Sequence, residues 1–264
     1  IKVRDTLKFL TQSSQIYRQN INTKIIAITG SCGKTTLKEL LGSSLKKIYK
    51  VSTSPKSYNN KYGVPLSLFN INQKDQYGVL EIGMNKKGEI DFLSKIVKPD
   101  VSVITNINYA HAKNFRNIKQ IALAKSEIIN NTNNNGSIVL NADDRFFNFH
   151  KKIALRKNLN ILSFSIKKKN TNVKLISIKK VDKKFKIVVK INNLKSYFFI
   201  SNNFQNNILN ILATLSIMSI FIDMSKLDNN IFFNFKIPEG RGNFIKIKLK
   251  NKNLNLVDES YNSN

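Results

Sequence analysis

A glycine-rich loop between an apolar run and a helical stretch constrains the fold of this chain more than any other feature. The apolar run is Ile25–Thr29, the loop is Gly30–Thr36 (GSCGKTT), and the helical stretch is Thr35–Lys47. Glycines let the backbone wrap closely around a phosphate, and the N-terminus of the following helix adds a favourable dipole. The order strand, loop and helix therefore predicts a phosphate-binding loop in an α/β protein.

The residues of this loop have separate expected roles. Lys34 is expected to neutralise the β- and γ-phosphates of ATP, and the Thr35 hydroxyl to ligate Mg²⁺. The spacing G-x-x-x-x-G-K-[ST] is not met because Ile28 stands in place of its first glycine, but T-G-x-x-G-K-T-T is met in full. Cys32 is interpreted as a small filler residue in preference to a catalytic thiol. The residues expected to contact ATP here are Thr29, Gly30, Ser31, Cys32, Gly33, Lys34, Thr35 and Thr36.

Apolar runs alternate with helical stretches after the loop. The runs are Val79–Gly83, Val101–Thr105 and Ser137–Leu140, and the helical stretches between them are Glu89–Val97 and Ile118–Asn130. Continuous apolar strands separated by helices are typical of a mostly parallel sheet with helices on both faces. The fold class predicted is therefore α/β, of the kind found in P-loop nucleotide-binding domains.

The pattern changes after about residue 160. Val173–Ile178, Phe185–Ile191 and Tyr197–Ile200 are short runs with polar residues interleaved, joined by turns rich in lysine and asparagine. They predict a small antiparallel sheet beside the main one. Ile208–Phe221 has apolar residues at helical spacing and predicts a buried helix.

The charge balance is strongly basic, with 44 Lys and Arg against 16 Asp and Glu and a formal net charge of +28. A basic surface suits nucleic acid. However, lysine, asparagine and isoleucine are enriched together, which indicates AT-rich codons, and the lysines are spread along the chain. We therefore expect no specific nucleic acid. A single cysteine cannot form an internal disulfide framework, which favours a reducing cytoplasm. No apolar run approaches the ~20 residues of a membrane span. We expect a monomer.

Several polar side chains fall where predicted strands or helices would bring them near the phosphate loop. Glu81 is alone among the apolar residues of a strand, and a buried carboxylate needs a partner such as Mg²⁺. Asn106 ends the next strand, and His111 follows it. Lys125 lies on an apolar helical face, and Asn141–Asp144 (NADD) ends another strand. Taken singly, His111 is more typical of a hydrogen-bonded structural residue, and Lys125 of a lysine that snorkels to solvent.

Taken together, these residues resemble the central domain of the Mur ligase family, which builds the peptidoglycan stem peptide. The matching stretches are Ile28–Thr36, Asn59-Asn60, Gly63–Pro65, Leu80–Asn85, Gly88–Ile90, Pro99-Asp100, Ile104–Asn106, Ala110-His111, Ala124-Lys125, Asn141–Asp144, Gly240-Arg241 and Asp258–Asn262. Within the family, Leu80–Asn85 and Asp258–Asn262 favour the branch that joins D-Ala-D-Ala to UDP-N-acetylmuramoyl-tripeptide.

The resemblance implies ATP, two Mg²⁺ ions and an acyl-phosphate mechanism. It implies that Glu81 binds the Mg²⁺ that bridges the ATP phosphates, and that His111 helps to hold a second Mg²⁺. It also implies that Lys125 is carbamylated, which turns a cation into a metal ligand. Lys34, Lys125 and His111 are thus the catalytic candidates. The remaining implied contacts are Arg241 and Asn207 with ATP, and Asn59 and Asn60 with the acceptor substrate.

The resemblance also predicts the domain organisation. Residues 1–24 are expected to connect to a substrate domain upstream, residues 25–264 to form the central ATP-binding domain, and the C-terminal domain to be absent. We therefore expect these 264 residues alone to ligate poorly. Two alternatives stay open at this point. One is another amide ligase, a sister Mur enzyme or a folate polyglutamate ligase, and the other is a non-catalytic module that binds nucleotides or polyanions.

Overall fold

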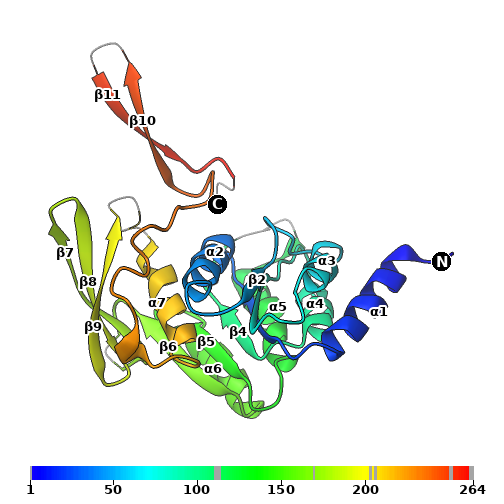
Figure 1. The fold of residues 1–264 in the computed structure, drawn as a ribbon. Helices are drawn as coiled ribbons and strands as arrows, with labels where there is room; N and C mark the ends of the chain where they lie inside the picture. Colours follow the sequence, from blue (N-terminus) through cyan, green and yellow to red (C-terminus); the bar gives the residue numbers. More distant parts are fainter. Residues whose placement is uncertain are drawn as a thin grey trace.

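The computed structural model describes residues 2–109, 114–168, 170–201, 204, 207–249 and 252–261. These residues form one nine-stranded sheet with helices on both faces, and one two-stranded hairpin that projects from the body (Figure 1). The strand order of the large sheet is β2-β3-β1-β4-β5-β6-β7-β8-β9. Its strands are β1 (Lys24–Thr29), β2 (Val51–Thr53), β3 (Tyr77–Glu81), β4 (Val101–Ile104), β5 (Ser137–Asn141), β6 (Asn160–Ser165), β7 (Val173–Val181), β8 (Lys184–Ile191) and β9 (Leu194–Ser201).

The six strands β2 to β6 and β1 are parallel, as the sequence predicts. The chain passes from β1 to the edge strand β2, returns to β3 beside β1, and then crosses to β4 on the other side of β1. The register places Ile28 opposite Glu81 and Thr29 opposite Ile104. Ligands of open α/β sheets bind outside the carboxyl ends of the strands where such a reversal occurs. The end of β1 is therefore the place to look for a site.

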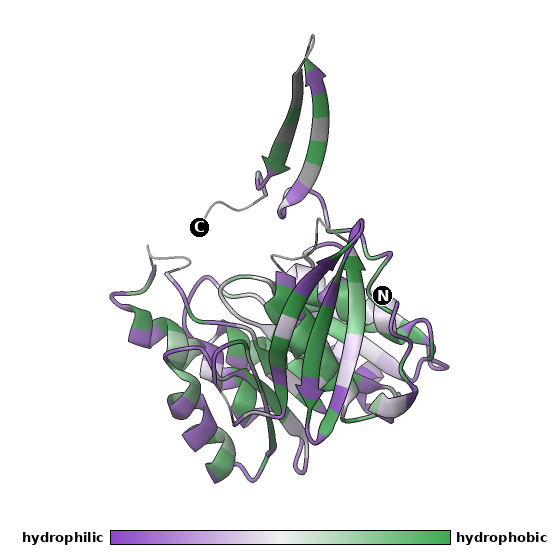
Figure 2. Ribbon diagram, turned by 90° about the vertical axis from the view of Figure 1, so that its left-hand side faces the viewer, coloured by the Kyte–Doolittle hydropathy of each residue, from purple (hydrophilic) through white to green (hydrophobic). Residues whose placement is uncertain are grey.

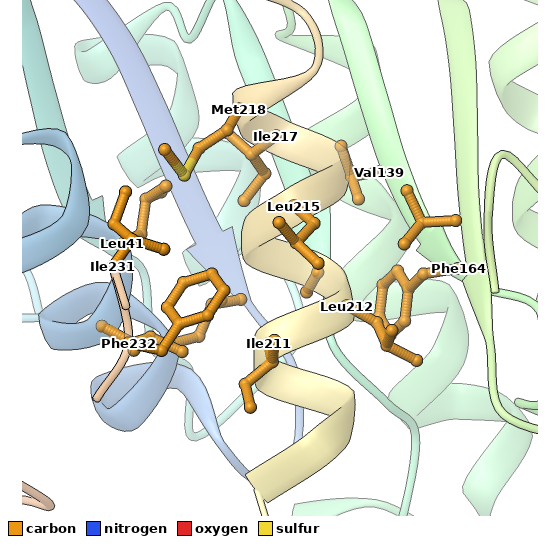
Figure 3. Packing of buried hydrophobic residues seen from close by; sticks show 14 of the residues in the cluster. Leu41, Val139, Phe164, Ile211, Leu212, Leu215, Ile217, Met218, Ile231 and Phe232 are labelled. Atoms are coloured by element: carbon orange, nitrogen blue, oxygen red, sulfur yellow. The ribbon is translucent and has the colours of Figure 1, made fainter. Parts of the chain in front are cut away.

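Two apolar layers enclose the sheet because successive residues of a strand face opposite sides. Ile26 and Ile28 pack into the layer under α2 and α7, whereas Ile25 and Ala27 pack into the layer under α3, α4 and α5. In Figure 3, α7 presents Leu212 and its neighbours to the sheet and to α2. The helices are α1 (Thr6–Gln19), α2 (Lys34–Leu45), α3 (Gly63–Phe69), α4 (Glu89–Val97), α5 (Ile118–Asn130), α6 (Phe147–Arg156) and α7 (Ile208–Met218).

The antiparallel strands are not a separate sheet but the continuation of the parallel one. Phe164 and Ser165 of β6 pair in parallel with Val173 and Lys174 of β7, and β8 and β9 follow as antiparallel neighbours. Val173 joins the same apolar layer as α7, which explains why the strands extend the sheet. Figure 2 shows these three strands with apolar and polar residues interleaved along them.

A second antiparallel pair, β10 (Asn243–Leu249) and β11 (Lys252–Asp258), was not predicted. It stands away from the body, and the turn at Gly240 before it returns close to the phosphate loop (Figure 1). The short elements β2, α3, α6 and β6 also went unpredicted, because each is brief or contains turn-forming residues. No helix in the described part of the chain is long and apolar enough to cross a membrane.

The first helix is docked on the body. Tyr17 donates a hydrogen bond to the carbonyl of Ile71 at 2.5 Å, and Arg18 donates to Val97 O at 2.7 Å and to Asp100 Oδ2 at 3.1 Å. Burial lowers the pKa of Arg18, and Asp100 opposes that shift. The predicted connector thus begins with a helix that is fixed against α3 and the end of α4.

Candidate active site

The phosphate loop requires its two glycines. Gly30 has φ +147° and Gly33, the N-cap of α2, has φ +81°. A Cβ atom at Gly30 would lie 1.9 Å from Thr105 Oγ1, and one at Gly33 would lie 3.0 Å from Asn210 Oδ1. Residues other than glycine rarely adopt such backbone angles, and here the space is also occupied. The loop therefore approaches β4 and α7 too closely for a side chain.

The residues after β4 hold the loop by hydrogen bonds. Thr105 Oγ1 donates to Cys32 O at 2.6 Å, and Cys32 N donates to Asn106 Oδ1 at 3.0 Å. Ser31 Oγ donates to Asn108 O at 2.9 Å and accepts from Asn108 N at the same distance. These bonds fix the loop before any ligand arrives, and such preorganisation lowers the entropic cost of binding.

Lys34 extends back over the loop that precedes it. Its Nζ donates to the carbonyls of Gly30 at 2.9 Å and Ser31 at 3.3 Å. Burial lowers the pKa of Lys34, while the negative charge of Glu81 raises it. A bound phosphate would offer this ammonium a charged acceptor in place of two carbonyls, and such bonds are stronger.

Glu81 is the buried carboxylate of the site. Its Oε2 accepts from Thr35 Oγ1 at 2.6 Å, and its Oε1 accepts from Asn59 Nδ2 at 2.7 Å. The side chain is 2% exposed. A hydroxyl and a carboxylate side by side provide the oxygen ligands that Mg²⁺ prefers, and Mg²⁺ beside phosphates needs only one or two protein ligands. Within the described residues, no cluster of three or more His, Cys, Asp or Glu side chains could hold a metal by itself.

Lys125 reaches the phosphate loop from α5, which covers the face of the sheet opposite to α2. It is carried by α5, whose apolar residues Ile121 and Ala124 are fully buried. Its side chain is buried too, and Nζ donates to Gly30 O at 2.9 Å. Burial first, and repulsion from Lys34 second, lower the pKa of Lys125 well below its usual 10.5. This environment favours a neutral amine.

Two cavities meet at the loop. The larger, of about 690 Å³, is lined by Lys34, Glu81 and Lys125 and also by Asn59 and Asn60. The smaller, of about 250 Å³, lies over the loop itself. Residues that line this smaller cavity include Ser31, Cys32, Gly33, Lys34, Thr36, Asn207, Asn210, Arg241 and Tyr261. Lys34, Arg241 and Tyr261 line both cavities, so these side chains stand at the boundary between them.

The structure brings the predicted site residues together, apart from two. Thr29 is fully buried at the end of β1, and its hydroxyl has no hydrogen-bond partner among the described residues. His111 lies outside the described residues. Asn60 has a local role as well, because its Oδ1 accepts from Gly63 N at the start of α3 at 2.9 Å.

Sequence reasoning missed a contact between two distant segments. Ser57 Oγ lies 3.2 Å from Arg241 Nη2 and 2.7 Å from Tyr261 OH, and the Arg241 guanidinium stacks on the Tyr261 ring at 4.0 Å. The stack joins the chain before β10 to the chain after β11. No local pattern marks Ser57, since its partners are about two hundred positions away.

The family profile of the Mur ligase middle domain matches residues 28–218, which include the loop, Glu81 and Lys125. The chain belongs to the Mur ligase family. A similar curated relative is the UDP-N-acetylmuramoyl-tripeptide–D-alanyl-D-alanine ligase of Buchnera aphidicola from Acyrthosiphon pisum. It is 41% identical over 168 residues, which are 64% of this chain and 36% of that protein.

Two solved Mur ligase structures are also similar. MurF from Acinetobacter baumannii has a TM-score of 0.88 at 30% identity. The match covers 100% of this chain and 56% of the MurF chain. MurF ligase from Thermotoga maritima, solved in complex with ADP, has a TM-score of 0.86 at 28% identity; this chain covers 59% of it. The chain thus spans no more than 59% of the length of any of these three relatives. The predicted α/β fold with additional antiparallel strands is confirmed.

Proposed function

We propose that this chain is the central, ATP-binding part of an amide ligase of peptidoglycan precursor synthesis, which adds D-Ala-D-Ala to UDP-N-acetylmuramoyl-tripeptide. The observation that carries the proposal is that Lys34, Glu81 and Lys125 line one cavity, with Thr35 bonded to Glu81 beside it. A module that only bound nucleotide would need the loop, and not a buried carboxylate and a buried lysine beside it. The similar relatives are UDP-N-acetylmuramoyl-tripeptide–D-alanyl-D-alanine ligases, which favours this acceptor and this amine.

ATP would occupy the smaller cavity, with its γ-phosphate at Lys34. Ser31, Gly33, Lys34 and Thr36 of the loop line this cavity, and so do Asn207 and Arg241. The ADP named for the Thermotoga relative supports this assignment. The acceptor would occupy the larger cavity, against Asn59 and Asn60.

The reaction overcomes the poor reactivity of a carboxylate towards an amine. The tripeptide carboxylate attacks the γ-phosphate of ATP, ADP leaves, and an acyl phosphate forms. The amine of D-Ala-D-Ala then attacks the acyl carbon through a tetrahedral intermediate, and phosphate leaves with the bonding electrons. Lys34 would stabilise the negative charge on the transferred group, and the fixed loop would hold the phosphates in line. This mechanism requires no protein nucleophile, which is consistent with Cys32 as a filler residue.

Thr35 and Glu81 would hold a Mg²⁺ ion in this mechanism. These two residues suit Mg²⁺ because their side-chain oxygens lie 2.6 Å apart and Mg²⁺ prefers oxygen ligands. When bound, the ion would neutralise charge on the phosphate oxygens. Asn59 keeps the Glu81 carboxylate oriented from the other side.

A second ion would require a further ligand, and we propose that carbamylated Lys125 supplies it, with His111. A neutral amine attacks CO₂ and loses a proton, which leaves a carbamate. The buried, pKa-lowered amine of Lys125 suits this step. A crystal structure with ATP at high bicarbonate would show the added carboxyl group on Lys125. An unmodified amine there, with unmodified Lys125 by mass spectrometry, would contradict the assignment.

The domain division is part of the proposal. Residues 1–24 would connect to a substrate domain, and a further domain would follow residue 264 and close over ATP. The protein would act as a cytoplasmic monomer, and the 264 residues alone would bind nucleotide weakly and ligate poorly.

The deciding experiment is phosphate release from MgATP by the complete gene product. UDP-N-acetylmuramoyl-tripeptide is present throughout, and D-Ala-D-Ala is compared with single amino acids and with glutamate. Release only with D-Ala-D-Ala is the expected result. Release with another amine would keep the acyl-phosphate mechanism and change the substrate. If no amine gave release despite tight MgATP binding, the proposed function would be wrong.

A further inference from the structure

Lys38 is a buried cation that the proposed mechanism does not use. It and Lys125 are the largest fully buried side chains among the described residues, and Lys38 lines neither of the two cavities at the loop. Burying an ammonium is unfavourable unless it is paired and hydrogen-bonded. A fully buried lysine outside the cavities therefore indicates a specific structural task.

The partners of Lys38 show what that task is. Its Nζ donates to the carbonyls of Ser54 and Lys56, both at 2.5 Å, and forms an ion pair with Glu39 at 2.9 Å. An ammonium has three protons, so these partners use its full donor capacity. Lys38 lies one turn after Thr35 on α2, on the same side of the helix. It thus ties the phosphate-loop helix to the segment that follows β2.

This segment, residues 54–60, contacts Glu81 and also Arg241 and Tyr261, which line both cavities together with Lys34. Ser54 Oγ accepts from Glu81 N at 3.3 Å, and Asn59 Nδ2 donates to Glu81 Oε1. Ser57 Oγ contacts Arg241 and Tyr261. Between them, Lys56 has φ +41°, a left-handed conformation that persists only where the surroundings enforce it. The Lys38 ammonium is bonded to the carbonyl of this residue.

We propose that Lys38 is a positioning residue, which holds residues 54–60 so that Asn59 meets Glu81 and Ser57 meets Arg241 and Tyr261. The proposal rests on the proposed function, because the wall positioned in this way is the acceptor side of the larger cavity. Lys38 contacts neither the phosphate loop nor the smaller cavity. Its loss should therefore impair use of the acceptor substrate more than nucleotide binding, which the segment reaches only through its contacts with Glu81, Arg241 and Tyr261.

The first test needs no ligation and uses the complete gene product. Amide hydrogen exchange is compared in wild type, Lys38→Met, and the control Lys46→Met on the exposed end of the same helix. In Lys38→Met, residues 54–60 should exchange about tenfold faster or more, because the carbonyls of Ser54 and Lys56 lose their donor. Residues 30–36 should keep their wild-type rates. Unchanged exchange at 54–60, or equally faster exchange over the whole chain, would overturn the proposal.

The second test is kinetic. In Lys38→Met, kcat/KM for UDP-N-acetylmuramoyl-tripeptide should fall roughly 10- to 100-fold, the range for misplaced substrate contacts, and the Kd of MgATP should change by a smaller factor. An effect on the Kd of MgATP as large as that on kcat/KM would overturn the proposal. Ser57→Ala should lower kcat/KM in the wild type but have little further effect in Lys38→Met, because residues that act through one another are not additive. Full additivity would overturn the proposal.

Two further results keep the tests separable. Lys38→Arg retains the charge and donors, so it should recover part of the lost kcat/KM if hydrogen bonding to the segment is the cause. If Lys38→Met does not fold, the exchange and kinetic tests use Lys38→Gln, which keeps a donor amide but loses the ammonium. Faster exchange confined to residues 54–60 supports the tie, and wild-type exchange there overturns it. If the wild type does not ligate, the proposed function fails, and the exchange test still decides whether Lys38 holds the segment.

Discussion

The parallel half of the sheet and its antiparallel edge use polar side chains in opposite ways. At the carboxyl end of β1, polar groups are buried and bonded to one another, as in the contacts among Thr35, Glu81 and Asn59. On β8 and β9, polar groups remain near solvent: Lys184 lies 3.8 Å over the Phe199 ring, and Lys186 lies 4.1 Å over the Tyr197 ring.

The difference shows where this fold can support chemistry. Parallel strands end together at one edge, and each is followed by a helix or loop that can place a side chain there. Adjacent antiparallel strands run in opposite directions, so their lysines are distributed along the surface. We therefore expect substitutions in the parallel half to impair activity, and those on the antiparallel edge to alter little beyond local packing.

The largest expected effect is at Lys34. Lys34→Ala should lower kcat in the complete gene product by roughly 10³-fold or more, the range for a cation that stabilises a transferred phosphoryl group. The unfolding transition in denaturant should remain cooperative, which separates lost chemistry from lost structure. Near-normal turnover in this variant would show that the loop does not serve phosphoryl transfer.

The next effect compares two glycines with positive φ. Gly30→Ala would place a Cβ 1.9 Å from Thr105 Oγ1, whereas Gly88, with φ +88°, has no atom within 4 Å of such a Cβ. Gly88→Ala should cost about 1 kcal/mol for the backbone angle alone. Gly30→Ala should cost about 1–3 kcal/mol more, for the overlap. Urea unfolding of both variants measures this, and equal losses would show that Thr105 does not confine the loop.

A smaller effect is expected in the pH dependence of stability at Lys125. Its pKa in the folded protein is well below the 10.5 of the unfolded chain. Between these two values the unfolded chain binds the extra proton, so Lys125 makes the free energy of unfolding rise with pH. Below the folded pKa this dependence ends, because both states are protonated.

Lys125→Met should lose this rise. Urea unfolding of wild type and variant across this pH window measures the effect. The free energy of unfolding of the wild type should rise relative to that of the variant as the pH rises. Lys46→Met, at the exposed lysine that caps the C-terminus of α2, serves as the control and should retain the wild-type slope. Parallel curves for the wild type and Lys125→Met would mean that Lys125 titrates as it does in the unfolded chain.

The smallest effect is expected on the antiparallel edge. Lys186→Ala removes a cation from the Tyr197 ring, a contact worth about 0.5–1 kcal/mol near the surface. The free energy of unfolding should fall by no more than this, and kcat and KM should remain those of the wild type. A marked loss of activity in Lys186→Ala would show that the antiparallel edge also contributes to catalysis.

Much of the fold could be predicted because its signals are local. α4 and α5 have the predicted bounds, Glu89–Val97 and Ile118–Asn130, since each helix shows its own apolar periodicity. The edge strands were recognised as antiparallel, but their place in the main sheet depends on two residue pairs between β6 and β7. Such pairing is decided by the packing of a shared apolar layer, and no single segment reveals it.

The sequence by itself determined the phosphate loop, the α/β class and the chemical types of Lys34, Glu81 and Lys125, because a contiguous motif and a regular apolar period are properties of neighbouring residues. Only the tertiary structure decided that Thr35 and Asn59 both bind Glu81, and that Lys38 is buried against residues 54–56. Those contacts depend on β3 lying beside β1 and on β2 lying at the edge. Strand order is set by the packing of the whole chain, so the partners of a buried charge become known only when the fold is.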